Sequence, residues 1–241
     1  MKIVAISDTH TKHKKITIPK CDVLVHAGDF SWKGTYWETF RFMKWLNEQP
    51  AKHKIVIAGN HELTLDASNR GRFDANIWAA MRGISDVHYL DNSSVTIDGI
   101  KFYGTPWTPF FYDWAFNGSE GADAPIRMEG NRDLVEVYGE IPEDTQVLIC
   151  HGPPRGIVDM AYDERAGSYE MRKLLESDKL ALLRLYLCGH IHEGRGHEIA
   201  CGNVNFCNVS SLGRDYSTAQ TPVVIDLDEF GNVDSVQGYE E

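Results

Sequence analysis

The chain has 241 residues, of which 42% are hydrophobic and 24% are charged, and these are the proportions of an ordinary folded domain rather than of a disordered chain. No apolar run approaches the length of about 20 residues that a membrane span needs, which argues against a membrane protein. The 24 Lys and Arg residues against 35 Asp and Glu residues give a formal net charge of −11. Because this excess of negative charge repels a nucleic-acid backbone, we expect a small substrate and no polynucleotide partner.

We expect one domain over residues 1–241, because this length is near the upper size of a single domain. The chain starts with a strand-like run and lacks the basic region, apolar core and cleavage site of a secretory signal, so we expect a cytoplasmic location. The sequence leaves the oligomeric state open. The cysteines are odd in number, widely spaced and mostly in apolar contexts, and we interpret them as reduced core thiols: Cys21, Cys150, Cys188, Cys201 and Cys207.

The first half of the chain alternates apolar runs with amphipathic segments. Residues 3–7, 23–27 and 55–58 are short and apolar, which is typical of buried strands, and residues 36–47 carry apolar side chains at helical spacing. This alternation predicts an α/β fold. In open α/β sheets, ligands bind in the loops that follow the strand ends.

The second half of the chain predicts hairpins and further strands. Residues 87–90, 95–97 and 100–103 are strand-like and are separated by the turn signals Asp91-Asn92 and Asp98-Gly99. Residues 146–150 and 182–188 are apolar strands that each end at a histidine motif, with a helix around 169–177 between them, and strands at 204–209 and 223–227 follow. We therefore expect two stacked sheets flanked by helices, with every polar motif on the same rim.

Two carboxylates and one histidine follow the first two predicted strands. Asp8 and His10 lie two residues apart, so both side chains can leave one strand end toward the same ion. Gly28 permits a tight turn before Asp29, whose two carboxylate oxygens suit it to bridge two ions about 3.5 to 4 Å apart. Asp and His at this spacing are more often turn or capping residues when they occur alone, so the prediction of a metal site depends on the motifs that follow.

An amide, a histidine and a carboxylate follow the third predicted strand. Asn60 offers a neutral carbonyl oxygen to a metal, and the imidazole of His61 can give a proton to a leaving group. Glu62 fits a structural role, at a helix N-terminus or as a partner that orients the motif, at least as well as a catalytic one.

Three more histidines follow later strands. His151 precedes the rigid turn Gly152-Pro153-Pro154, and His190 and His192 repeat the two-residue spacing after a glycine. Structural zinc favours four closed Cys and His ligands, whereas these motifs mix Asp and Asn oxygens with imidazoles. The whole set predicts an open centre of two metal ions that catalyses hydrolysis.

In this order, the motifs D-x-H, G-D, G-N-H-E, H and G-H-x-H resemble the signature of the calcineurin-like metallophosphoesterase superfamily. The segments CDVLVHAGD (21–29), KIVIAGNHE (54–62), YGTPWT (103–108) and HGPP (151–154) are similar to its metallophosphoesterase domain-containing branch and bacterial relatives. The resemblance implies an α/β fold, a four-layer α/β/β/α sandwich of two mixed sheets flanked by helices. It also implies a metal-dependent phosphoric ester hydrolase.

The resemblance further implies two divalent metal ions, manganese, iron, zinc or similar, and a bridging hydroxide that attacks phosphorus in line. It assigns the first ion to Asp8, His10, Asp29 and His192, and the second to Asp29, Asn60, His151 and His190. His61 matches the leaving-group acid or transition-state stabiliser of the family. The residues expected to carry catalysis are thus His61, Asp29 and Asn60. Because His190 is retained where the animal branch can carry glycine, the resemblance implies full activity.

The expected substrate is a phosphodiester, in particular a small or cyclic nucleotide, since the resembled branch is associated with that activity. A broad phosphomonoesterase or protein phosphatase is the alternative, and a noncatalytic metal-binding interaction module is disfavoured by the retained motif histidines. Residues 107–116 carry aromatic side chains that stack a base or pack over the sheet, and the sequence leaves these two roles open: Trp107, Phe110, Phe111, Tyr112, Trp114 and Phe116.

Overall fold

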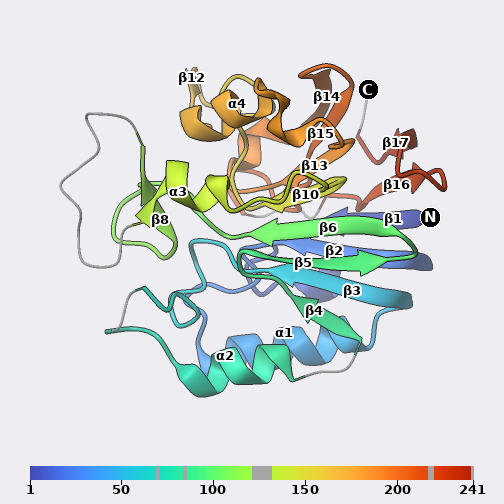
Figure 1. Cartoon of the computed structure of the whole chain (residues 1–241). Helices are drawn as coiled ribbons and strands as arrows, with labels where there is room; N and C mark the ends of the chain where they lie inside the picture. The colour runs from blue at the N-terminus through green and yellow to red at the C-terminus, as the bar shows by residue number, and fades with distance from the viewer. Residues whose placement is uncertain (69–70, 84–85, 121–131, 217–219, 240–241) are drawn as a thin grey trace.

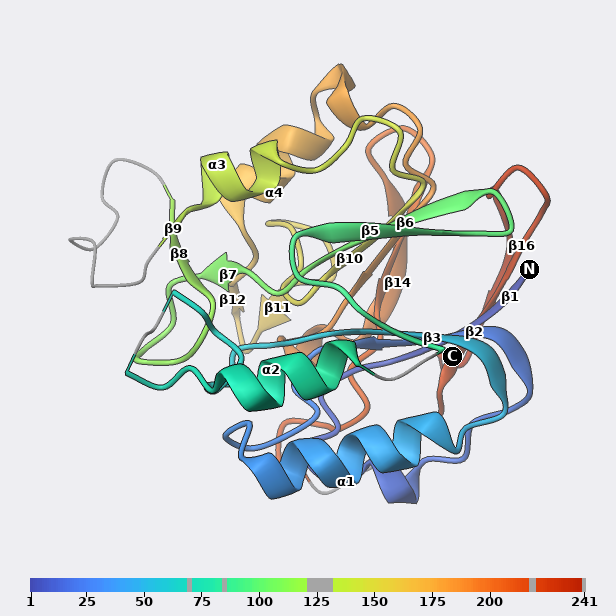
Figure 2. The ribbon, with the colours of Figure 1, turned by 60° about the horizontal axis from the view of Figure 1, so that its bottom comes forward.

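Two six-stranded mixed sheets stack face to face in the computed structural model, which describes residues 1–68, 71–83, 86–120, 132–216 and 220–239. Helices cover the outer face of each sheet, as Figures 1 and 2 show. This confirms the two stacked sheets flanked by helices that the sequence pattern predicts, and the four-layer α/β/β/α sandwich that the family resemblance implies.

The first sheet comes mainly from the N-terminal half of the chain. Its strand order is β17-β16-β1-β2-β3-β4, in which β1 to β4 are parallel and β16 and β17 are antiparallel to their neighbours. The strands are β1 (Lys2–Ile6), β2 (Cys21–Ala27), β3 (Ala51–Ile57), β4 (Val87–Tyr89), β16 (Val223–Leu227) and β17 (Val233–Gln237). The central strands are buried on both faces, which accounts for their nearly continuous apolar sequences.

The second sheet has the order β14-β15-β13-β10-β6-β5. Its four inner strands are parallel, and the edge strands β14 and β5 are antiparallel to their neighbours. The strands are β5 (Ser93–Ile97), β6 (Ile100–Thr105), β10 (Val147–Cys150), β13 (Leu185–Cys188), β14 (Gly196–Ala200) and β15 (Val204–Asn208).

Helices α1 (Tyr36–Asn47) and α2 (Ala75–Arg82) cover the first sheet, and α3 (Leu134–Gly139) and α4 (Tyr169–Leu175) cover the second (Figure 1). Within the described ranges, three short 3-10 helices lie at His13–Lys15, Asp178–Leu180 and His192–Gly194. Two small sheets complete the described part. One pairs β7 (Thr108–Pro109), β8 (Asn117–Ser119) and β9 (Arg132–Asp133), and the other pairs β11 (Met160–Ala161) with β12 (Glu164–Arg165).

The alternation of side chains along β1 shows how the layers are joined. Ile3 and Ala5 belong to the apolar cluster between the two sheets, whereas Val4 belongs to the cluster that contains Phe42 and Leu46 of α1. α1 has the bounds that the sequence predicts, and a capping box between Thr35 and Glu38 fixes its start. Packing on both faces thus holds the ends of the central strands in fixed positions.

The structure corrects one predicted hairpin. β4 pairs in parallel with β3 in the first sheet, whereas β5 pairs antiparallel with β6 in the second, so the turn signal at Asp91-Asn92 marks a passage between sheets. Turn chemistry is local and does not specify which sheet the next strand joins. The sequence analysis also missed α2, α3, β14 and β17. Residues of β14 and β17 are half-buried or exposed, so these edge strands lack a continuous apolar run.

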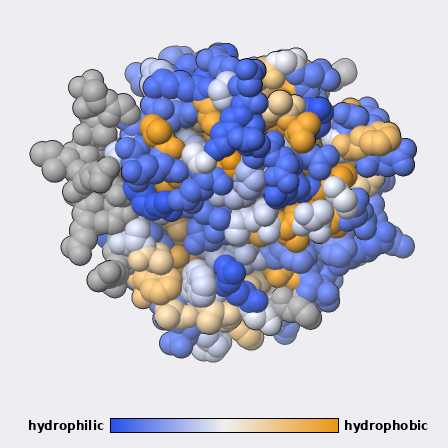
Figure 3. Space-filling view, in the orientation of Figure 1, coloured by the Kyte–Doolittle hydropathy of each residue, from blue (hydrophilic) through white to orange (hydrophobic). Residues whose placement is uncertain are grey.

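Hydrophilic residues dominate the molecular face in Figure 3, where hydrophobic residues form separate patches. All five cysteines are free and four of them are buried, as the sequence predicts. Over the described ranges, we find no helix with the length and apolar character of a membrane span.

Candidate metal centre

The predicted ligands follow the carboxyl ends of parallel strands from both sheets. Asp8 follows β1, Asp29 follows β2, Asn60 follows β3, His151 follows β10 and His190 follows β13. An isolated β-bridge between residues 7 and 210 links the two sheets at this edge. One rim therefore collects side chains that are up to 184 residues apart in the chain, from Asp8 to His192.

A first group of donor atoms gathers at Asp8, His10 and His192. The Nε2 atom of His192 lies 3.5 Å from Oδ1 of Asp8 and 3.4 Å from Nε2 of His10. The same nitrogen of His10 lies 3.8 Å from Oδ2 of Asp29. All four residues are buried, so their polar atoms face one another rather than bulk water.

A second group gathers at Asp29, His151 and His190. The Oδ1 atom of Asp29 lies 3.4 Å from Nε2 of His151. The Oδ1 atom of Asn60 lies 3.0 Å from that nitrogen and 2.8 Å from Nδ1 of His190. Asp29 thus lies between the two groups: its Oδ1 faces His151 in the second group and its Oδ2 faces His10 in the first, which is the arrangement that a bridging ligand requires.

The histidine rings are oriented as metal ligands usually are. His10, His151 and His192 turn Nε2 toward the cluster and donate from Nδ1 to backbone carbonyl oxygens at 3.2, 2.8 and 3.2 Å, which belong to Ser31, Ala27 and Gly213. Such outer hydrogen bonds fix the ring and its tautomer. The buried carboxylate, imidazole and amide donors therefore fit two divalent cations.

The ligand loops fit against each other too closely for side chains at two motif glycines. A Cβ atom on Gly189 would lie 2.1 Å from Oδ2 of Asp8, and one on Gly59 would lie 2.3 Å from Oδ1 of Asp29. Several predicted ligands also adopt a left-handed backbone, which is strained for any residue but glycine and concentrates at functional sites. These are Asp8 (φ 51°), His10 (φ 38°), Asp29 (φ 57°) and His190 (φ 67°).

The histidine rings around Asp29 favour the ionised form of its carboxyl. Burial raises the pKa of this carboxyl, but the neighbouring His151 and His61 rings lower it well below its ordinary value. Burial opposes charge on His151, yet the Asp29 carboxylate raises the pKa of this ring to about 9. Burial lowers the pKa values of His10 and His190 to about 4, so these two rings are neutral, as metal ligands must be.

Glu62 orients the ligand loops. Its carboxylate is fully buried and accepts hydrogen bonds from the backbone N–H groups of Asp29 and Ser31, both at 2.9 Å, and of Gly59 at 2.7 Å. Burial, and then the charge of Asp29, raise the pKa of Glu62 to about 8. Of the two roles that the sequence left open for this residue, these contacts favour the structural one.

His61 lies against the same cluster but with a different anchor. Its Nδ1 atom lies 3.0 Å from the backbone carbonyl oxygen of Trp32, to which it donates, and its Nε2 atom lies 3.9 Å from Oδ2 of Asp29. The ring stacks on Trp114 at 4.2 Å between centroids. One ring nitrogen of His61 also lies close enough to ligand atoms of His10 and Asp29 for the three residues to share a metal ion. The geometry therefore permits His61 to act as a metal ligand as well as a proton donor.

A family model described as "Calcineurin-like phosphoesterase" matches residues 1–194 of the chain. The chain belongs to this family. The human "Metallophosphoesterase domain-containing protein 1" is 35% identical over 94% of this phosphoesterase and 71% of its own length. A UPF0046 protein of Caenorhabditis elegans is 34% identical over 93% and 74% of the two chains. The crystal structure of TT1561 of Thermus thermophilus shares the fold, with a TM-score of 0.55 at 14% identity over 98% of each chain. The predicted resemblance is thus confirmed.

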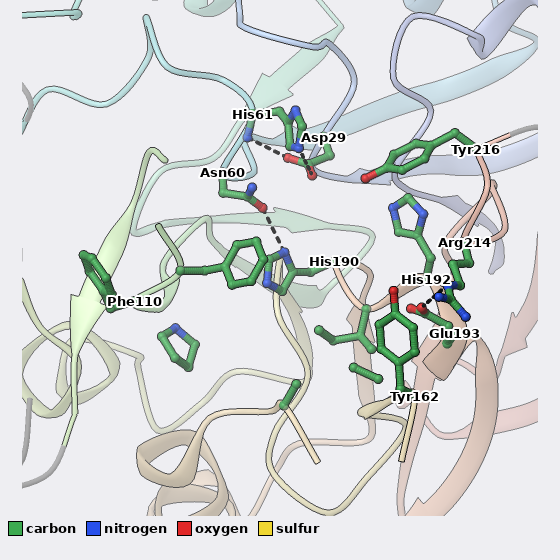
Figure 4. Close-up of a pocket in the computed structure, with 15 residues that line it drawn as sticks. Asp29, Asn60, His61, Phe110, Tyr162, His190, His192, Glu193, Arg214 and Tyr216 are labelled. Carbon is green, nitrogen blue, oxygen red and sulfur yellow. Dashed lines mark hydrogen bonds and ion pairs between the residues drawn. The ribbon is translucent and has the colours of Figure 1, made fainter. Parts of the chain in front are cut away.

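A cavity of about 370 Å³ opens over the metal-ligand cluster of this phosphoesterase. Figure 4 shows Asp29, Asn60 and His61 along one side, Phe110 at one end, and Glu193 and Arg214 at the other. This volume suits a small molecule rather than a polymer.

The aromatic segment 107–116 divides between the core and the cavity. Trp107 and Phe116 are 4% and 1% exposed and pack against each other, whereas Phe110 and Phe111 line the cavity. Phe111 meets the ring of His190 edge-on at 6.0 Å between centroids. Packing therefore accounts for Trp107 and Phe116, whereas Phe110 and Phe111 lie at the cavity, where base stacking stays a prediction.

The sequence analysis missed most of the cavity wall. The missed polar and aromatic side chains come from the tip of the β11–β12 hairpin, from the 3-10 helix His192–Gly194 and from the loop after β15: Tyr162, Glu193, Arg214 and Tyr216. The position of Arg214 and Tyr216 in the chain was one available signal. Both lie in the loop after β15, and this strand is parallel to β13 and ends at the same rim as His190. Glu193 directly follows His192, so its place beside the cluster also followed from the motif.

Proposed function

We propose that this protein is a phosphodiesterase that cleaves small phosphodiesters, including cyclic nucleotides, at a centre of two divalent metal ions. The observation that supports this function best is the presence of two donor groups with Asp29 facing both of them, beneath a small aromatic cavity. The net charge of −11 and the cavity volume of about 370 Å³ both argue against a polynucleotide substrate.

Each predicted ligand has a place in this proposal. Two bound divalent ions supply charge neutralisation at the phosphoryl oxygens and a water nucleophile of lowered pKa. The first ion is assigned to Asp8, His10, Asp29 and His192, and the second to Asp29, Asn60, His151 and His190. As an imidazolium, His61 would give a proton to the leaving alkoxide from Nε2, because its Nδ1–H is already engaged by a backbone carbonyl. Asp29 and Asn60 keep the reacting phosphorus beside His61.

Metal removal gives the first test. Exhaustive chelation is expected to lower diesterase activity at least about a hundredfold, because both charge neutralisation and nucleophile activation depend on the ions. Addition of manganese, iron or zinc should restore activity, and metal analysis should find two ions per chain. Activity that survives complete metal removal would contradict the proposal.

Substrate class is tested with the same preparation. We expect a 4-nitrophenyl phosphodiester and the 2′,3′- and 3′,5′-cyclic nucleotides to give higher kcat/KM than 4-nitrophenyl phosphate. A higher kcat/KM for the monoester would favour the broad phosphomonoesterase instead. No turnover of any ester by protein that holds two metal ions would favour a noncatalytic metal-binding module.

Phe111 offers a test of nucleotide recognition, because its ring lies at the cavity and is 49% exposed. The substitution Phe111→Ala is expected to lower kcat/KM about tenfold for thymidine 5′-(4-nitrophenyl phosphate), because the thymine base of this ester loses the ring on which it stacks. The loss should be smaller for methyl 4-nitrophenyl phosphate, which has the same leaving group and no base. Phe230→Ala, an exposed residue in the turn between β16 and β17, is the control. An equal loss on both esters would argue against stacking.

A further inference from the structure

Tyr216 is a cavity residue to which the motifs assign no role. Its ring lies 5.0 Å from that of His10, 4.9 Å from that of His192 and 5.2 Å from that of Trp32, measured between centroids. Two of these neighbours are predicted metal ligands. The phenol therefore lies directly against the first donor group, and Figure 4 shows it reaching across the cavity wall toward Asp29.

The backbone at Tyr216 is held in a costly conformation. Its φ of 58° is in the same left-handed region as the φ angles of Asp8, Asp29 and His190. A side chain in this region costs about 1 kcal/mol or more, so the surroundings must impose it. The N–H of Tyr216 donates to the carbonyl of Gly213 at 2.9 Å, and its carbonyl accepts from Nζ of Lys12.

The hydroxyl of Tyr216 makes no hydrogen bond within the described part of the chain, although the backbone of the residue is fixed on both sides. A phenol has an ordinary pKa near 10, so this group is a hydrogen-bond donor at neutral pH. Burial, and then the negative charges of Asp29, Asp8 and Glu193, raise the pKa of Tyr216 further, so the hydroxyl keeps its proton. The donor is thus left for a ligand in the cavity.

Arg214 is another described cavity-lining residue with hydrogen-bond donors, but it is less well placed to donate to a ligand over the metal-ligand cluster. Its guanidinium lies 3.9 Å over the ring of Tyr162, and its Nε atom lies 3.8 Å from Oε1 of Glu193. The side chain is 63% exposed, at the rim of the cavity. Tyr216, in contrast, contacts the rings of two predicted ligands.

We propose that the Tyr216 hydroxyl donates a hydrogen bond to a non-bridging oxygen of the phosphoryl group bound in the cavity, and so acts as a catalytic residue. This inference rests on the proposed function as a phosphoesterase. A fixed donor at a phosphoryl oxygen stabilises the charge that gathers there in the transition state. It also strengthens the binding of inorganic phosphate.

The test is Tyr216→Phe in the full chain loaded with manganese. This variant keeps the ring contacts with His10, His192 and Trp32 and removes only the hydroxyl. We expect the Kd for orthophosphate to rise about tenfold in calorimetry, as befits a hydrogen bond to a charged group. We also expect kcat for a diester to fall about 10- to 100-fold with a smaller change in KM, at unchanged metal content.

Tyr112→Phe is the matched control, because Tyr112 also has a left-handed backbone, with φ 48°, but is 71% exposed and lies outside the cavity lining. It should bind orthophosphate like the wild type. A Tyr216→Phe protein whose Kd for orthophosphate and kcat match the wild type would overturn the proposal, and the ring would then serve as wall alone. If the wild type bound phosphate but cleaved no ester, the proposed function would fail, while a weaker Kd in Tyr216→Phe would still support the hydrogen bond.

Discussion

Asp29→Asn is expected to lower kcat about a thousandfold or more, which corresponds to roughly 4 kcal/mol of lost transition-state stabilisation. Asp29 turns Oδ2 toward His10 and Oδ1 toward His151, so its carboxylate faces both donor groups. An amide has a single acceptor oxygen and no charge. It therefore cannot neutralise two cations at once, and metal content should fall below two ions per chain.

The fold should survive this substitution. Oδ1 of Asp29 accepts a hydrogen bond from the backbone N–H of His61 at 2.9 Å, and an Asn side chain can keep that contact. Asp22→Asn is the matched control, since Asp22 also lies on β2 but near its amino end, where it pairs with Lys52 at the surface. Thermal unfolding should show similar midpoints for both variants. An Asp29→Asn protein with two ions and wild-type kcat would exclude a bridging role.

The rim of the site was predictable from the sequence because its causes are local. Asp8 and Asp29 each follow a short apolar strand directly, and parallel strands in a stacked sandwich present their carboxyl ends at one edge. The two-residue spacing of His190 and His192 brings one ring to each of the two neighbouring donor groups. Motif glycines such as Gly189 were also informative, since close approach to Asp8 forbids a side chain there.

The wall of the cavity was not predictable in the same way. Tyr162 comes from a hairpin tip and Arg214 from the loop after β15, and their contact depends on where two separate loops settle. No periodicity specifies such a contact, because loops have no repeating pattern of burial. The aromatic segment shows the same limit: Trp107 and Phe111 are four residues apart, yet one is in the core and the other is at the cavity.

The second large effect is expected for His61→Asn, because general acid catalysis typically contributes about a hundredfold or more. The hydrogen bond from Nδ1 to the carbonyl of Trp32 and the stacking on Trp114 leave Nε2 to face Asp29 and the cavity. Proton transfer matters most for a poor leaving group. The loss should therefore be about a hundredfold or more for an alkyl leaving group and clearly smaller for 4-nitrophenolate, which leaves without help.

Metal analysis of the same variant separates proton transfer from metal ligation, both of which the position of His61 permits. A proton donor predicts two ions per chain in His61→Asn, whereas a ligand predicts loss of an ion and an equal fall in rate for both leaving groups. His53→Asn is the control, since His53 lies on β3 well before the loop that carries His61. If His61→Asn kept its ions and lost the same factor on both esters, the ring would instead stabilise charge on the phosphoryl group, because only transfer to the leaving oxygen makes the loss depend on leaving-group basicity.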